Sequence, residues 1–267
     1  MTVISTLVIT NITTLVCLLI ITIYYKIPNK IIRKIIDNLK KIIRSILEPR
    51  HGRVNFMKMV NNKFGKMMLL DVGCGNNSPF YFRTNFPKIK YTGIDVGDYN
   101  QTMPILDADY IITSPENFAN KICEWKNIFD VVFSSHNLEH CNDRNATLVA
   151  MAMALKKGGY LYLSFPTEKS VNFPGPREGT LNYYDDSTHK DKPPNFIETL
   201  RILKNNGIDI IYHNKSYKPF FLFIKGIFEE RKSKRENKVY YSTWAYYGFE
   251  AIIWGKKLYH GIRTNGT

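Results

Sequence analysis

A short apolar run that ends in an aspartate and a glycine turn is the feature that most constrains the fold. Residues 67–77 read Met-Met-Leu-Leu-Asp-Val-Gly-Cys-Gly-Asn-Asn. This pattern predicts a buried strand that ends at Asp71, and Gly73 and Gly75 then let a ligand approach the backbone closely. A helix is expected to start around Asn77, so that its free N–H groups face the same space. These residues predict a ligand site at the carboxyl edge of an α/β sheet.

A second acidic residue indicates the kind of ligand. Asp95 ends the next apolar run, residues 91–95, about 20 residues beyond the glycine turn. At this distance an acidic side chain can accept hydrogen bonds from both hydroxyl groups of a ribose. A tight turn without a ligand is the alternative, and the presence of Asp95 weighs against it. The two features together predict a nucleoside pocket.

The glycine pattern differs from the fingerprint of dinucleotide-binding folds. That fingerprint is Gly-x-Gly-x-x-Gly, and Ser78 stands here in place of its third glycine. It also gives no reason for an acidic residue two places before the first glycine, where this chain has Asp71. The order Asp-x-Gly-x-Gly resembles the first motif of class I S-adenosylmethionine-dependent methyltransferases. Many members have a further glycine at the position of Asn77, and asparagine tolerates unusual backbone angles better than most residues.

This resemblance implies which residues bind the cofactor, S-adenosylmethionine. In the family the glycine loop passes under the amino-acid end of the cofactor, and the acidic residue before the loop orders both the loop and the cofactor amine. Near the third strand an acidic side chain can accept a hydrogen bond from the adenine amino group, and Asp109 is favoured over Asp107 for this role. The expected cofactor-binding residues are therefore Asp71, Gly73, Gly75, Asp95 and Asp109.

Further motifs follow in the order expected for the same family. Residues 129–135 predict a strand by their β-branched and aromatic content, residues 138–140 read Leu-Glu-His, and a helical stretch closes with Lys-Lys-Gly-Gly at 156–159. This order is similar to that of the type 11-like branch, which acts on small molecules, and it covers roughly residues 66–212. The resemblance implies a seven-strand Rossmann-like methyltransferase sheet with helices on both faces. Here an N-terminal apolar helix is expected to precede it.

Methyl transfer requires a positioned acceptor, and an oxygen or nitrogen acceptor can also need a base. The acceptor should lie beyond the carboxyl ends of the central strands, where His136, Asn137 and His140 follow a predicted strand. His189 lies in a long loop further along the chain and could cover the site. Because histidine titrates near neutral pH, the candidate bases are His136, His140 and His189. A structural, hydrogen-bonded role is the alternative for each of them.

The spacing His136-x-x-Glu139-His140 also matches the inverted zinc-protease pattern. That pattern needs a helix that presents both histidines, whereas this segment follows a predicted strand, so we do not expect a protease. A related group of quinone-biosynthetic methyltransferases places a metal near the same motif. A divalent ion held by Glu139 and His140 is therefore an alternative to our expectation, which is a site without a metal.

The amino-terminal region combines an uncharged segment with a basic one. Residues 3–25 contain no Asp, Glu, Lys or Arg and would form a helix of about 34 Å, enough to cross a bilayer. Residues 26–53 carry nine basic and two acidic side chains, a net +7 within the formal +14 of the chain. The uncharged segment predicts a single-pass membrane protein. Because basic flanks stay on the cytoplasmic side, the rest of the chain is expected in the cytoplasm. The parts of the protein would be a transmembrane anchor at 1–25, a basic amphipathic linker at 26–53 and a cytoplasmic methyltransferase domain at 54–267.

Several alternatives stay open for the charged segments. A buried or surface-lying helix is the alternative for residues 3–25. The basic linker favours an anionic membrane surface as a partner, with a solvated basic helix as the other interpretation. Nucleic acid is not expected, because no recognition motif accompanies the charge. Residues 220–238 are apolar and then basic; we expect a helix that faces the core, with a second membrane contact or part of an acceptor pocket as alternatives. Residues 244–254 are expected to form the last strand.

The sequence thus predicts a membrane-anchored S-adenosylmethionine-dependent methyltransferase that acts on a small or lipid-linked acceptor. A methyltransferase-like binding module without catalysis is one alternative. A nicotinamide-dependent oxidoreductase is another, and Ser78 weighs against it.

Overall fold

The computed structural model describes residues 33–34, 51–75, 77–98 and 109–259. The chain divides into two compact units, residues 1–48 and 49–267, and nearly all described residues belong to the second. The apolar segment 3–25, expected to span a membrane, lies outside the described residues, as does most of the basic linker. Within the described ranges, no helix combines the length and the apolar character that crossing a bilayer requires.

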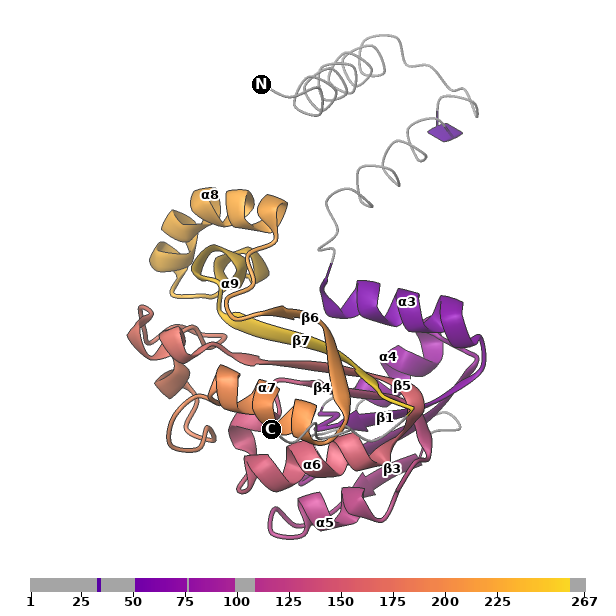
Figure 1. Cartoon of the computed structure of the whole chain (residues 1–267). Coiled ribbons are helices and arrows are strands. Elements are labelled where there is room, and N and C mark those ends of the chain that lie inside the picture. Colours follow the sequence, from indigo (N-terminus) through magenta and orange to yellow (C-terminus); the bar gives the residue numbers. More distant parts are fainter. Residues whose placement is uncertain (1–32, 35–50, 76, 99–108, 260–267) are drawn as a thin grey trace, which may run out of the picture. The chain divides into compact units, whose positions relative to one another are not determined.

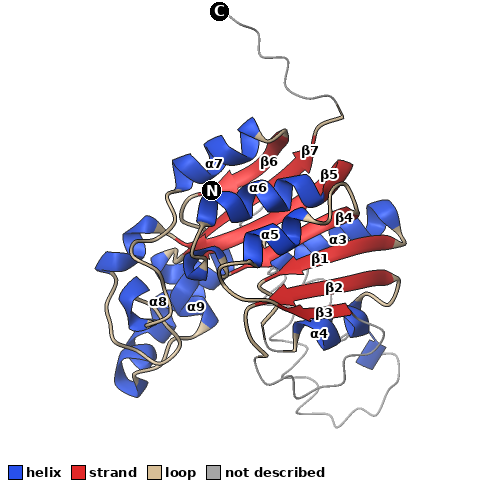
Figure 2. Ribbon diagram, turned by 90° about the horizontal axis from the view of Figure 1, so that it is seen from below, coloured by secondary structure: helices blue, strands red, loops and turns tan. Residues whose placement is uncertain are grey.

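Within the described residues seven strands form one sheet, which confirms the predicted seven-strand Rossmann-like sheet (Figure 2). The order across the sheet is β3-β2-β1-β4-β5-β7-β6; β7 runs antiparallel to both of its neighbours, and the other pairs are parallel. From β1 the following strands are added first on one side, as β2 and β3, and then on the other side, starting with β4. Ligands of open α/β sheets bind at the point between β1 and β4 where this order switches. The strands are β1 (Met67–Val72), β2 (Ile89–Asp95), β3 (Asp109–Ile112), β4 (Phe129–Ser135), β5 (Leu155–Pro166), β6 (Ile208–Asn214) and β7 (Glu250–Lys257).

Helices cover both faces of the sheet, as predicted. One face carries α5, α6 and α7 and the other carries α3 and α4, while α8 and α9 pack on each other beside one end of the sheet (Figure 1). The helices are α3 (Arg53–Phe64), α4 (Ser78–Asn85), α5 (Phe118–Cys123), α6 (Arg144–Ala154), α7 (Phe196–Asn205), α8 (Phe220–Glu236) and α9 (Tyr241–Tyr247). Short 3-10 turns are η1 (Leu138–His140), η2 (Glu168–Asn172) and η3 (Tyr183–Asp185).

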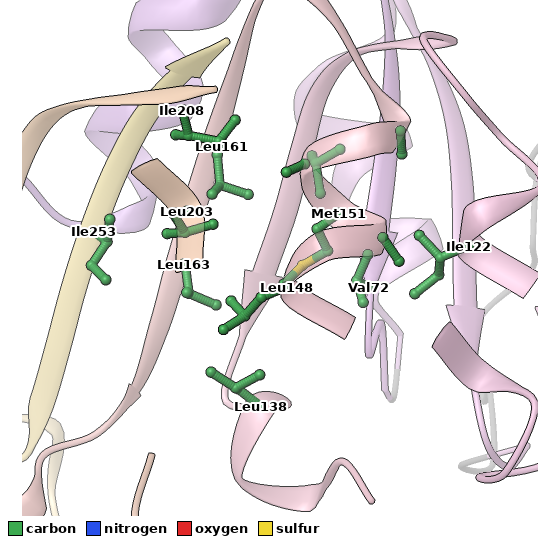
Figure 3. Packing of buried hydrophobic residues seen from close by; sticks show 14 of the residues in the cluster. Val72, Ile122, Leu138, Leu148, Met151, Leu161, Leu163, Leu203, Ile208 and Ile253 are labelled. Carbon is green, nitrogen blue, oxygen red and sulfur yellow. The ribbon is translucent and has the colours of Figure 1, made fainter. Parts of the chain in front are cut away.

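Alternating side chains of the central strands fill two separate cores. In β1, Leu70 and Val72 face α5 and α6, whereas Leu69 faces α3 and α4. Figure 3 shows Leu148 and Met151 of α6 packed over the first of these cores. Each fully buried side chain of this size contributes about 1.5–3 kcal/mol. The two cores therefore hold the carboxyl ends of β1, β2 and β4 in fixed positions, and the functional site lies at these ends.

The carboxyl-terminal part departs from two expectations. Residues 244–247 belong to α9 and not to the last strand, because Gly248 adopts a left-handed conformation (φ 68°) that ends the helix, and β7 starts only at Glu250. The expected core-facing helix at 220–238 is α8. Only its inner side is buried, at Gly226, Glu230 and Ser233, and its outer side is exposed.

Candidate active site

The glycine turn after β1 is a tight reversal that packs against the chain after β4. The amide of Gly73 donates to the carbonyl of Ile94 at 2.9 Å, and Gly73 has a φ of 73°. A Cβ at Gly73 would lie only 2.2–2.3 Å from atoms of the Asn137 side chain, so the close approach requires glycine. A Cβ at Gly75 (φ 55°) would meet nothing within 4 Å. Asn77 takes the left-handed conformation at φ 58° and begins α4, as the pattern predicted.

Asp95 ends β2 and fixes the turn through its carboxylate. Its Oδ2 accepts a hydrogen bond from the Gly75 amide at 2.7 Å, and its Oδ1 accepts from the Val96 amide at 2.7 Å. Burial raises the pKa of Asp95, and the two backbone hydrogen bonds partly offset that rise. Each carboxylate oxygen has two lone pairs, so both oxygens retain an acceptor position. Asp95 lines a cavity, which is where a ribose acceptor is required.

Asp71 lies behind the turn. It is 2% exposed and accepts a hydrogen bond from the Tyr91 hydroxyl at 2.9 Å. Burial raises its pKa to about 7, against the lowering effect of Tyr91. Among the described residues Asp71 does not belong to the cavity wall. This placement is suited to ordering the loop, and a direct contact with the cofactor amine stays a prediction.

A cavity of about 480 Å³ lies at the carboxyl ends of β1, β2 and β4. Its size is that of a small-molecule site. The wall brings together segments that are far apart in the sequence, including one that the sequence patterns did not indicate, 115–119. The lining residues are Gly73, Gly75, Asp95, Val96, Pro115, Glu116, Phe118, Ala119, His136, Asn137, His140, Cys141, Asn142, Asp143, Thr147, Asp186, Thr188 and Lys190.

The acidic residue expected beside adenine, Asp109, lies at the amino end of β3. It pairs with Thr92, whereas the carboxyl end of the strand, Ile112, pairs with Asp95. The cavity lies past that carboxyl end, and Glu116 is the acidic residue of its wall there. A Pro-Glu pair just before a helix is typical of a helix start. That signal could have directed attention to Glu116, at the carboxyl end of the strand.

His136 is held between two carboxylates. Its Nδ1 lies 3.2 Å from Glu139 Oε1 and its Nε2 lies 2.9 Å from Glu250 Oε1, while Phe249 stacks on the ring. Burial disfavours the charged ring, but the hydrogen bonds and charges of Glu139 and Glu250 outweigh burial and raise its pKa to about 10. His136 is therefore protonated at neutral pH. With both nitrogens engaged, it is a poor candidate for a general base.

His189 packs behind the cavity wall. Its side chain is 4% exposed, its Nδ1 lies 2.5 Å from the Tyr183 carbonyl oxygen, and its ring stacks on that of Tyr183. Its Nε2 lies 3.9 Å from Asp186 Oδ2. The sequence analysis placed His189 in a loop over the site, and the loop does reach the site. The residues of this loop that line the cavity are, among those described, Asp186, Thr188 and Lys190.

His140 is the histidine whose surroundings suit a base. Thr188 donates its hydroxyl proton to Asp186 Oδ1 at 2.6 Å, and the hydroxyl oxygen of Thr188 lies 2.9 Å from His140 Nδ1. Because that hydroxyl proton is already donated, Thr188 accepts from a protonated Nδ1. The lone pair then resides on Nε2, for which no hydrogen bond occurs among the described residues. Partial burial opposes ionisation of Asp186, but hydrogen bonds from Thr188 lower its pKa, so that Asp186 is a carboxylate at neutral pH.

Three residues at this position could also hold a cation. Ligand atoms of Glu139, His140 and His189 all lie within 4.8 Å of one another. Glu139 is fully buried, and its Oε2 has no hydrogen-bond partner among the described residues. Two imidazoles and a carboxylate form a ligand set that suits divalent transition metals. The sequence analysis considered Glu139 and His140 for this role, and the structure adds His189 to the group.

Comparison with known proteins identifies the class. A family model described as "Methyltransferase domain" matches residues 33–209, more than half of the chain, and the chain belongs to this family. This match agrees with the methyltransferase class that the motifs predicted. The alternative of a nicotinamide-dependent oxidoreductase finds no support in these matches.

Individual relatives agree with the family. The chain is 36% identical over 103 residues to the ubiquinone biosynthesis O-methyltransferase of Saccharophagus degradans, a match that covers 36% of this chain and 42% of that protein. The chain thus matches less than half the length of this relative. Its fold is similar to an S-adenosylmethionine-dependent methyltransferase from Mesorhizobium loti, with 15% identity, a TM-score of 0.51 and coverage of 72% of this chain and 91% of the other. A protein described as a sarcosine dimethylglycine methyltransferase, from Galdieria sulphuraria, gives 14% identity and a TM-score of 0.52, with coverage of 76% and 84%.

Proposed function

We propose that this methyltransferase acts on a hydroxyl group of a small-molecule acceptor and that His140 is the general base. One observation carries this proposal: the hydrogen-bonded series of Asp186, Thr188 and His140 in the cavity wall, which leaves Nε2 of the imidazole as the acceptor of a proton. An oxygen acceptor needs such a base, because an alcohol or phenol must lose its proton as it attacks.

Different residues of the site bind the cofactor and accept the proton. Asp95 is in place to accept ribose hydroxyls, and the turn at Gly73 and Gly75 leaves room for the amino-acid end of the cofactor. Bound S-adenosylmethionine supplies an activated methyl group, whose bond to sulfur breaks as its bond to the acceptor oxygen forms, leaving S-adenosylhomocysteine. His140 takes the hydroxyl proton at Nε2. Asp186 then stabilises the imidazolium through Thr188, as a buried carboxylate does for a catalytic histidine.

The curated relative supports oxygen as the acceptor atom. It is described as an O-methyltransferase, and its matching region is 36% identical to this chain. The match covers only part of both proteins, so the support concerns the type of reaction and not the identity of the acceptor.

We also propose that the chain is anchored in a membrane by residues 3–25, with the catalytic domain on the cytoplasmic side. The uncharged segment and its +7 flank support this proposal. An anchored enzyme can reach acceptors that stay in or near the bilayer, so a lipid-linked hydroxyl compound is a second candidate acceptor beside the small molecule. Resistance of the full chain to alkaline carbonate extraction tests the anchor.

The base is tested by replacing His140 with glutamine in the full chain. We expect the turnover number to fall by about 10²–10⁴-fold, the range of general-base catalysis, in an assay that follows labelled methyl transfer to a panel of phenols and catechols. The dissociation constant of S-adenosylhomocysteine, measured by calorimetry, should change less than threefold. His213→Gln is the matched control, because this histidine is exposed on β6.

Two outcomes would contradict the role of His140. Normal turnover in His140→Gln would remove the base from this position. A rate that a chelator abolishes and a divalent cation restores would make His140 a metal ligand, together with Glu139 and His189, and the proton acceptor would have to be another group.

A further inference from the structure

The outer side of α8 carries an exposed stripe of apolar and then basic side chains. Phe220, Ile224 and Phe228 recur every fourth residue, and their exposed fractions are 68%, 37% and 78%. Arg231 and Arg235 continue the same line on the helix surface, since residues three and four apart share one helical face. We call this set the α8 stripe. Three large apolar side chains at these exposures are unusual on one solvated helix, where polar residues normally occupy the outer face.

The inner side of α8 is held against the rest of the domain, so the helix cannot rotate to bury the stripe. Gly226 crosses α9 so closely that a Cβ there would lie 2.3 Å from the Ser242 carbonyl oxygen. About one turn further on, the carboxylate of Glu230 accepts two hydrogen bonds from the buried guanidinium of Arg177, both at 3.0 Å, and one from the Tyr247 hydroxyl at 2.7 Å. Breaking a buried ion pair of this kind is strongly destabilising. The orientation of α8, and with it the exposure of the stripe, is therefore fixed.

The charges around the stripe are positive on balance. α8 has five basic and three acidic side chains, and the acidic ones are already paired: Glu230 with Arg177, Glu229 with Lys225 at 3.3 Å, and Glu236 with Lys232 at 4.0 Å. Arg231 and Arg235 are both exposed beside the aromatic rings, and Arg235 also lies 3.5 Å from Glu236. Phenylalanine and isoleucine next to arginine on one helix face is the composition of helices that lie in the interface of an anionic bilayer.

We propose that the α8 stripe docks on the surface of a lipid bilayer that contains anionic headgroups. Phe220, Ile224 and Phe228 insert among the acyl chains, and Arg231 and Arg235 contact lipid phosphates. The stripe contains none of the cavity-lining residues that the structure describes, and it does not depend on which acceptor the enzyme methylates. It does connect to the site through α9, because Trp244 of α9 packs on the ring of His136, with ring centroids 5.2 Å apart.

The test is a local measurement of depth with the full chain. Phe228→Trp adds a fourth tryptophan to the three already present, and vesicles are made with lipids brominated on the acyl chain. On vesicles of phosphatidylglycerol and phosphatidylcholine, the new indole should be quenched and the variant should lose about a quarter of its emission, the share of one tryptophan in four. Ile197→Trp is the matched control; this residue is 65% exposed on α7, away from the stripe, and its indole should not be quenched.

The basic part of the stripe is tested in the same variant. Arg231→Gln with Arg235→Gln should weaken docking by about fivefold for each arginine removed, seen as loss of quenching at limiting lipid, with an unchanged circular dichroism spectrum. Equal emission of Phe228→Trp on brominated and ordinary vesicles would overturn the proposal. A blue-shifted indole emission without vesicles would also overturn the proposal. If the shift depends on protein concentration, a second copy of the chain covers the stripe. If it does not, the chain's own residues cover it. Because the readout is confined to α8, it is independent of the methyl-transfer assay and of the anchor.

Discussion

At the scale of single residues, the closest constraint in the site is the contact between Gly73 and Asn137. Replacing Gly73 with alanine places a methyl group within 2.3 Å of the Asn137 side chain, in a backbone conformation (φ 73°) that alanine already disfavours. We expect the dissociation constant of S-adenosylhomocysteine to rise at least tenfold and the protein to lose about 2–4 kcal/mol, which combines the backbone cost with local overpacking. Calorimetry and urea unfolding measure the two effects.

Gly65→Ala separates the two contributions. Gly65 has a similar φ of 67°, but a Cβ there meets nothing within 4 Å. Gly65→Ala should lose only a backbone part of about 1–3 kcal/mol, because φ 67° with ψ −83° is a strained conformation for alanine. The variant should keep its affinity for S-adenosylhomocysteine. Equal effects of the two substitutions on affinity would show that the Gly73–Asn137 contact does not shape the site.

At the scale of elements, Arg144 at the start of α6 holds the segment that carries Thr188. Its guanidinium donates to the carbonyls of Lys190 and Lys192, both at 2.6 Å, and to that of Leu138 at 3.1 Å. Arg144→Lys keeps the charge but cannot form this fork, so the segment should loosen and the hydrogen bond between Thr188 and His140 should weaken. We expect turnover to fall about tenfold or more with unchanged S-adenosylhomocysteine affinity, and faster proteolysis within 183–192. Arg201→Lys, at an exposed ion pair on α7, is the control, and parity between the two variants would refute the role of Arg144.

The same elements show how far a sequence can be interpreted. The strands β1, β2 and β4 and the turn at Gly73 were predictable, because a short apolar run and a glycine turn depend on residues that are adjacent in the sequence. The partner of His140 was not predictable, because Thr188 is 48 residues away and lies in a loop that Arg144 helps to hold at the site. The surroundings of His136 were not predictable for the same reason: its pKa depends on Glu250, 114 residues away in β7.

At the scale of the whole molecule, the uneven distribution of positive charge along the chain indicates how the protein is placed at a membrane. Half of the formal +14 lies in residues 26–53, directly after an uncharged segment, and this order predicts a span with its basic side in the cytoplasm. We expect the full chain to remain with membranes in alkaline carbonate. A tag placed after residue 267 should resist external protease in intact cells, because it would lie on the cytoplasmic side. A variant that lacks residues 3–25 is the control and should be extracted. Release of the full chain by high salt alone would show that basic residues hold it at the surface and that residues 3–25 do not span the bilayer.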